Sequence, residues 1–188
     1  CNGTYGVQLF GSTIGTFTGA HDAVYSDAAP ALTLGDSVVD VAVIGTPTIN
    51  ESITRVALAT IPNDRTVIGV VSDLGSKTHI PSALDKNEMV HNHEGNTTSV
   101  TLAAEFAGLI DDNTFIAVNA VGEGCINVCG MNGDIEAGDL IVSSSIPGKG
   151  MKQADDIVRS CTVGKARASV TFASPTEVKQ IPCVYHCG

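Results

Sequence analysis

The sequence predicts an all-β protein, built mainly from short antiparallel strands in a sandwich-like or barrel-like arrangement. The chain has 188 residues, of which 43% are hydrophobic, yet it has no Trp and only 4% aromatic residues. Its core must therefore be aliphatic and rich in β-branched side chains, which favour strands. Twenty Gly and seven Pro indicate frequent tight turns between short elements. The length allows one domain or two small ones.

Several strands are predicted in the first half of the chain. Residues 5–19 alternate small, polar and apolar types with frequent Gly, which indicates short strands and turns. Residues 37–44 form a β-branched run that follows the turn pair Gly35-Asp36. Residues 53–58 alternate as a half-exposed strand does, and residues 67–71 have the apolar character of a buried one.

The middle of the chain gives a weaker signal. Residues 75–98 are polar and contain Pro81 and three His, which predicts a long loop or insert. Residues 100–110 fit either a short helix or a strand, so the one short helix that the fold could contain would lie there.

The second half shows clearer strands. Residues 115–121 are predicted as a strand, residues 122–124 (Gly-Glu-Gly) as a turn, and residues 125–129 as its returning partner. Residues 130–133 end in Asn-Gly, which suits a turn with positive φ. Further strands are predicted after the turn at Gly138-Asp139 and at residues 157–165, 168–172 and 178–185.

A short internal echo suggests two related β modules. Residues 34–39 (Leu-Gly-Asp-Ser-Val-Val) and 137–142 (Ala-Gly-Asp-Leu-Ile-Val) share a Gly-Asp turn that leads into an apolar strand. Each is followed later by a strand containing Val-Gly or Ile-Gly-Val, at residues 67–71 and 162–165. A duplication is one explanation, although six residues are a short match.

Charge excludes some partners. The net charge is −10 and the chain has ten Lys and Arg in all, so a surface that follows nucleic-acid phosphates is not expected. No run approaches the length of a membrane-spanning helix, and no secretory leader is recognisable, so membrane insertion is not expected either. The chain begins at Cys1 and not at Met, which suggests a fragment or a processed product.

The six Cys are best interpreted as free thiols. The pairs Cys125/Cys129 and Cys183/Cys187 each have four-residue separations, which on a strand places the two members on one face about 13 Å apart. Such a pair cannot form a disulfide within itself. The three residues between Cys125 and Cys129 also resemble a strand more than a zinc knuckle.

Two groups of residues are candidates for catalysis. His21 followed by Asp22 is the catalytic candidate, because a carboxylate beside an imidazole could orient it or protonate a scissile amide. Neighbours on a strand point to opposite faces, however, so a structural His in a turn is the competing interpretation. A pairing of residues 143–145 (Ser-Ser-Ser) with Lys149 or Lys152 would form a Ser/Lys dyad, but a connecting turn explains this segment more simply.

A metal site is a further hypothesis. His79, His91 and His93 lie near Asp85, Glu88 and Glu94, and His91 and His93 would share one face of a strand. A solvated polar loop is the alternative. No organic cofactor is predicted.

The residues 118–153 carry a resemblance to a known family. They contain Val-Asn-x-x-Gly-Glu-Gly, a strand ending in Val-Cys, an Asn-Gly turn, Ile-Glu-x-Gly-Asp and Ser-Ser-x-x-Pro-Gly-x-Gly-Met. This pattern resembles a segment near the C-termini of phage and large-virus tail-fibre and appendage proteins. Residues 155–158, 162–166 and 17–21 fit the same pattern, so the resemblance covers most of the chain.

The resemblance implies a C-terminal domain of a trimeric virion fibre, similar to intramolecular-chaperone domains that promote trimerisation and assembly. On this interpretation residues 1–19 lead in from a stalk, 20–74 and 99–188 form two β modules, and 75–98 form an insert. The partners would be two further copies and other fibre or tail proteins. Self-cleavage and binding to a host receptor are the alternatives, but the Asp-Tyr-Ala-Glu type motif of self-cleaving relatives is missing.

Overall fold

The structure is an all-β fold whose strands hydrogen-bond into one mixed sheet. The computed structural model describes residues 19–48, 51–76 and 108–187. Its strands are β1 (Gly19–Ser26), β2 (Ser37–Thr48), β3 (Glu51–Leu58), β4 (Val67–Ser76), β5 (Asn113–Cys129), β6 (Leu140–Ser143), β7 (Gly150–Lys152), β8 (Thr162–Ala166) and β9 (Val178–His186). Most of the pairs between these strands are antiparallel, and in the described ranges only β1–β3 and β5–β7 are parallel. The predicted fold class is confirmed.

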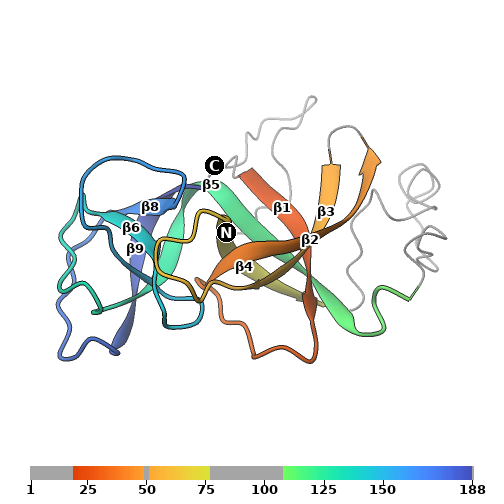
Figure 1. The fold of residues 1–188 in the computed structure, drawn as a ribbon, viewed down its shortest axis with the longest axis horizontal. Helices are drawn as coiled ribbons and strands as arrows, with labels where there is room; N and C mark the ends of the chain where they lie inside the picture. Colours follow the sequence, from red (N-terminus) through yellow and green to blue (C-terminus); the bar gives the residue numbers. More distant parts are fainter. Residues whose placement is uncertain (1–18, 49–50, 77–107, 188) are drawn as a thin grey trace, which may run out of the picture.

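The strand pairings close two rings of five strands each. In the first ring the order is β1-β3-β2-β4-β5, and the pairing of β5 with β1 closes it. In the second the order is β5-β7-β6-β8-β9, and the pairing of β9 with β5 closes it. The two rings lie side by side along the long axis of the molecule, and the long strand β5 passes through both (Figure 1).

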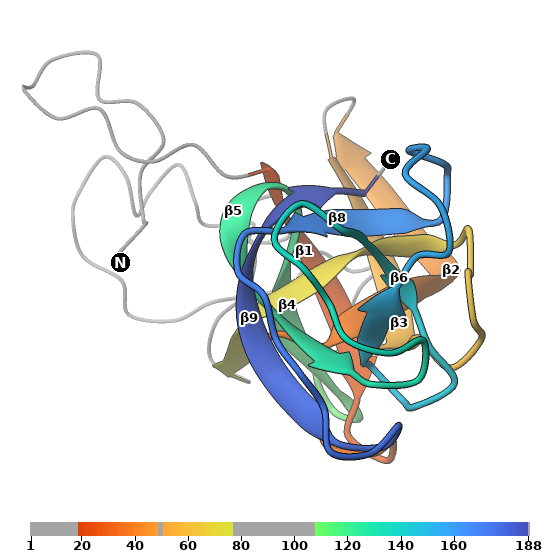
Figure 2. The same cartoon turned by 90° about the vertical axis from the view of Figure 1, so that its left-hand side faces the viewer.

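The second ring repeats the connectivity of the first. Strands β5 to β9 of the second ring correspond in order to strands β1 to β5 of the first. Each pairing in the first ring has a counterpart with the same direction in the second, so that the parallel pair β1–β3 corresponds to β5–β7 and the hairpin β2–β3 to β6–β7. Five strands that close on themselves leave few open edges, as in other small barrels. Figure 2 looks along the molecule from the end that β6, β8 and β9 form.

The echo between the two Gly-Asp segments has a structural counterpart. Asp36 Oδ2 accepts a hydrogen bond from the Thr33 amide (3.0 Å), and Asp139 Oδ2 accepts one from the Glu136 amide (2.7 Å). Both preceding glycines have positive φ, 93° at Gly35 and 104° at Gly138, which a side chain would disfavour. The same local turn therefore starts β2 and β6.

The partner strands of these turns are equivalent too. The Asp36 carbonyl accepts from the Val71 amide at 2.8 Å, and the Asp139 carbonyl accepts from the Ala166 amide at 2.8 Å. Two residues before Val71 and Ala166 lie Gly69 of β4 and Gly164 of β8. Each glycine packs against the backbone of the neighbouring strand, Gly69 against β5 and Gly164 against β9. The match thus extends from the turn to the strand that follows it in space.

One predicted hairpin is wrong. Residues 122–124 do not form a turn, because β5 runs without interruption from Asn113 to Cys129. Its second half pairs with β9, from Val121 opposite His186 to Cys129 opposite Val178. The glycines serve a different purpose: Gly122 has φ 111° within the continuous strand, and Gly124 lies directly against the Tyr185 ring.

Other elements differ from expectation near their ends. The strand expected over 157–165 begins only at Thr162, since residues 157–161 form a turn in which Asp155 accepts from the Ile157 amide. Residues 168–172 contribute only the bridge between Ile135 and Val170. Residues 5–18 and 100–107 lie outside the described residues, and residues 108–112 form a turn. The domain boundaries stay a prediction.

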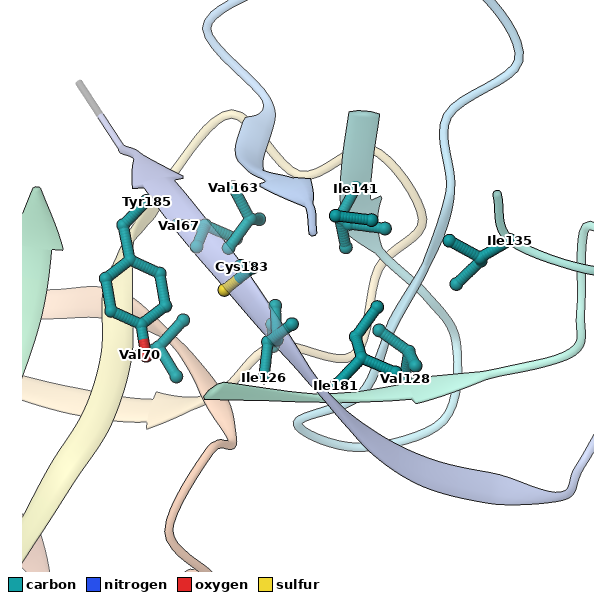
Figure 3. Packing of buried hydrophobic residues seen from close by; sticks show 12 residues of the cluster. Val67, Val70, Ile126, Val128, Ile135, Ile141, Val163, Ile181, Cys183 and Tyr185 are labelled. Atoms are coloured by element: carbon teal, nitrogen blue, oxygen red, sulfur yellow. The ribbon is translucent and has the colours of Figure 1, made fainter. Parts of the chain in front are cut away.

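Among the described residues, buried side chains form four groups. The largest contains Ile126 and Val128 of β5, with side chains from β6, β8 and β9, and it also takes in Val67 and Val70 of β4 (Figure 3). A second group lies within the first ring and includes Val38, Val71 and Val118. Because the largest group has members from both rings, the two rings share a hydrophobic core. In the described part of the chain no helix is long and apolar enough to cross a membrane.

Candidate functional site

The predicted catalytic residues lie at an open cleft on the first ring. His21 and Asp22 are neighbours in β1, opposite Val118 and Ala117 of β5. The cleft has a volume of about 530 Å³. It is lined by His21, Asp22, Asp40, Ser52, Thr54, Arg65, Thr66, Val67, Ile68, Ala120 and Cys187.

The cleft offers charged groups of both signs but no thiolate. Asp22 and Asp40 supply carboxylates and Arg65 a guanidinium, so a small polar ligand would find both donors and acceptors. Burial raises the pKa of Cys187 to about 12, and its thiol donates to the Val163 carbonyl at 3.4 Å. A thiol in that state is a poor nucleophile. The hydroxyls of Ser52 and Thr54 also line the cleft, and a catalytic role for His21 and Asp22 stays a prediction.

His79, His91 and His93 lie outside the described residues. Within residues 19–48, 51–76 and 108–187, no group of three or more His, Cys, Asp or Glu side chains is arranged to hold a metal ion.

The described cysteines are free thiols. Cys129 and Cys183 are buried in the core, whereas Cys125 is exposed. Burial raises the pKa of Cys183 to about 12, and the neighbouring Cys125 and Cys187 add to that shift. Cys183 is therefore a protonated core side chain, as expected for a buried thiol.

The hydroxyls of Ser143 and Ser144 bond to backbone groups and not to a lysine ammonium, and Ser145 Oγ contacts Met131 Sδ at 3.1 Å. Ser143 Oγ donates to the Ile61 carbonyl (2.8 Å) and accepts from the Asp64 amide (2.9 Å). Ser144 Oγ donates to the Lys149 carbonyl at 2.7 Å. The lysine ammonium groups pair instead with carboxylates, Lys149 with Asp36 and Lys152 with Asp139. These residues form a structural turn, as the simpler interpretation of the sequence had it.

The most organised polar site in the described part of the chain is one that the sequence did not predict. We call it the polar junction, because it lies where β2, β5, β9 and the turn before β7 meet. It comprises Thr33, Asp36, Asn127, Lys149 and Gln180. The side chain of Asp36 is 2% exposed and that of Lys149 is 16% exposed, so the ion pair between them is largely removed from water.

Hydrogen bonds connect every member of the polar junction. Asn127 Nδ2 donates to Asp36 Oδ1 at 2.7 Å, to the Leu34 carbonyl at 3.0 Å and to Thr33 Oγ1 at 3.2 Å. Asn127 Oδ1 accepts from Gln180 Nε2 at 3.1 Å. Lys149 Nζ donates to Asp36 Oδ1 and contacts Thr33 Oγ1 at 3.5 Å. Asp36 Oδ1 is thus the common acceptor for the amide of Asn127 and the ammonium of Lys149.

Backbone contacts hold the polar junction in place. The Asn127 amide donates to the Gly35 carbonyl and the Ser37 amide donates to the Gly148 carbonyl, both at 2.8 Å. The glycines leave room for this approach, since a Cβ on Gly148 would lie 2.9 Å from Asp36 Cγ. Nothing local in the sequence reveals the site, because its members lie far apart along the chain. The Gly35-Asp36 echo was the one signal that pointed to it.

No family model matches this chain, and no curated protein matches it.

Proposed function

We propose that this chain is a structural module of a viral or phage fibre or appendage, which acts as a homotrimer in assembly of the virion. The family resemblance of residues 118–153 supports the viral setting. The fold fits the same role, because closed rings of strands make a stiff building block.

The observation that carries the proposal is an open, apolar strand edge on β2. The ladder between β2 and β4 covers only residues 37 to 39 of β2. Beyond it, in the part of the chain that the structure describes, β2 is paired on its β3 side. Val41 and Val43 in this stretch are 59% and 64% exposed. An apolar edge strand in water is prone to pair with another strand.

A second copy of the chain is the occupant that this edge suits best. Unpaired amide and carbonyl groups need hydrogen-bond partners, which a neighbouring copy of the chain could supply. Burying exposed Val side chains adds about 25 cal/mol for each Å² of apolar area removed from water. In a threefold ring the β2 edge of each copy would contact a different surface of the next copy, and three such contacts would close a homotrimer.

Early trimerisation also has a kinetic purpose. A long intertwined β-stalk has high contact order, so it loses chain entropy before strand pairing compensates for it. A compact module that associates first brings the three stalk chains together. Its closest partners would then be the fibre proteins to which it is joined.

Light scattering of the purified chain tests the proposal. We expect a trimer mass at micromolar concentration. The double variant Val41→Lys/Val43→Lys should shift the mass toward the monomer, because it places charges on the open edge. The matched control is Ile157→Lys/Val158→Lys, whose side chains are 57% and 60% exposed in the segment between β7 and β8, and it should stay trimeric. A monomer mass for the unmodified chain would rule the proposal out.

A further inference from the structure

The polar junction brings together the three groups that are needed to form an amide bond between side chains. Lys149 supplies a primary amine, Asn127 a carboxamide and Asp36 a carboxyl group that contacts both nitrogens through Oδ1. We propose that Lys149 and Asn127 form an intramolecular isopeptide bond, with Asp36 as the acid–base catalyst.

The reaction needs no oxidant, cofactor or water. Asp36 takes a proton from the Lys149 ammonium, and the free amine attacks Cγ of Asn127. A bond forms between Nζ and Cγ, and the bond between Cγ and Nδ2 breaks. Asp36 gives this proton to the departing nitrogen, which leaves as ammonia, and it takes the second proton that Nζ must lose. That second proton passes to the ammonia, which diffuses away as ammonium and leaves Asp36 a carboxylate again. The product is a secondary amide, so one molecule of ammonia is lost and nothing is oxidised or reduced.

The hydrogen bonds on Asn127 suit this reaction. Gln180 Nε2 donates to Asn127 Oδ1 at 3.1 Å, so it can stabilise the negative charge that develops on this oxygen when the amine adds. On the other side, Nδ2 donates to Asp36 Oδ1 at 2.7 Å, the atom from which the leaving nitrogen must take its proton. Donor and acid therefore lie at the two ends of the carboxamide.

The amine is held beside the group that it would displace. Lys149 Nζ and Asn127 Nδ2 share Asp36 Oδ1 as an acceptor, and both also contact Thr33 Oγ1, at 3.5 Å and 3.2 Å. Because Lys149 Nζ and Asn127 Nδ2 share these two partners, the two nitrogens are held close together. Holding reactants in this way replaces a costly encounter by an intramolecular step.

Burial favours the chemistry as well. Asp36 is 1% exposed and Asn127 is 8% exposed. Proton transfer from the ammonium to the carboxylate removes two charges from a site where charge is costly. It leaves a neutral amine, which is the form that can attack. Exclusion of water protects the product from hydrolysis.

The bond would strengthen a weak point of the fold. β5 and β7 share a single register pair, Val128 with Gly150, and the reacting residues immediately precede these two. A covalent link there would fasten the turn before β7 to β5. The second Gly-Asp turn has no equivalent set: Asp139 pairs with Lys152 at 2.8 Å, and both side chains are more exposed, at 23% and 33%.

The intact mass of the full chain tests the proposal directly. The protein is unfolded and reduced before mass spectrometry, so that no disulfide contributes. We expect a mass lower than that of the sequence by one ammonia, and a branched peptide that joins Asn127 to Lys149 after proteolysis. An unchanged mass overturns the proposal. A loss of one water also overturns it, because that would place the bond between Lys149 and Asp36.

Three variants locate the reacting groups. Lys149→Arg and Asp36→Asn should both have the full mass of their sequences, because the first lacks the nucleophile and the second the acid. Lys152→Arg is the matched control, and it should still lose ammonia. Loss of ammonia from Lys149→Arg would mean that another asparagine or glutamine reacts, and the proposal would fail. The mass of the unmodified chain decides the question even if a variant does not fold.

Discussion

Asp36 shows how much can depend on one buried carboxylate. It caps the turn before β2 by accepting from the Thr33 amide, and it also pairs with Lys149 and accepts from Asn127. Removing a charge from water costs several kcal/mol, which only close partners offset. The equivalent Asp139 makes the same turn contact but keeps its ion pair near the surface. Asp36 and Asp139 therefore occupy equivalent turns but should contribute differently to the free energy of unfolding.

We predict that Asp36→Ala lowers the free energy of unfolding by about 3–5 kcal/mol, because it leaves the Lys149 ammonium buried without its counter-ion. Asp139→Ala is the matched control and should cost only about 1 kcal/mol, since its ion pair with Lys152 is partly solvated. Urea unfolding of both variants measures the difference. Equal costs would mean that burial of the polar junction adds nothing to stability.

Among the elements, β5 shows why a local sequence signal can mislead. Gly-Glu-Gly at residues 122–124 has the composition of a turn, yet the strand continues through it. The pairing partner is β9, which lies far ahead in the sequence, so a short window could not reveal it. The glycines allow close approach instead, as the contact of Gly124 with Tyr185 shows.

Two strand glycines provide a test of the repeated architecture. A Cβ on Gly69 would lie 2.5 Å from the Asn119 carbonyl oxygen, and a Cβ on Gly164 would lie 2.7 Å from the Val184 carbonyl oxygen. Both neighbours are backbone atoms and cannot rotate away. We expect Gly69→Ala and Gly164→Ala each to destabilise the fold by about 1–3 kcal/mol, as overpacking does elsewhere.

The control for these substitutions is Gly133→Asn, at an open turn where a Cβ would meet nothing within 4 Å. Asn tolerates positive φ better than most residues, so its effect should be smaller than that of either strand variant. Thermal unfolding of the three proteins compares them. A neutral Gly69→Ala or Gly164→Ala would contradict the close strand contact at that position.

At the scale of the whole molecule, the two rings are coupled by a shared strand and a shared core. β5 contributes its first half to one ring and its second half to the other. Val67 and Val70 of β4 pack in the same group as Ile126 and Val128 of β5. Neither ring can lose β5 without opening, so they should unfold as one unit.

Hydrogen exchange can measure this coupling. We predict that Val128→Ala, a fully buried position in the second ring, lowers amide protection in β1 and β4 as well as in β8 and β9. The cavity that it leaves should cost on the order of 1–3 kcal/mol, judged by other large-to-small core substitutions. A loss of protection confined to β8 and β9 would show that the rings unfold separately.

The sequence located most of the strands but not the polar site. The strands at residues 37–44, 53–58, 67–71 and 178–185 were correctly predicted, because each has its own apolar pattern. The turn at residues 130–133 was also correct, since the Gly133 amide donates to the Gly130 carbonyl at 3.0 Å. β7 was missed, since three residues carry too little pattern to predict a strand.

The sequence by itself determined the all-β class, the aliphatic core and the two Gly-Asp turns, because alternation of apolar residues and glycine conformation act over a few neighbouring residues. Only the tertiary structure decided that β5 continues through its glycines, that two rings close on it, and that Asp36, Asn127 and Lys149 meet. Those features depend on contacts between residues far apart in the chain. Burial, close packing and shared hydrogen bonds select these contacts over other possible strand pairings, and no local preference does so.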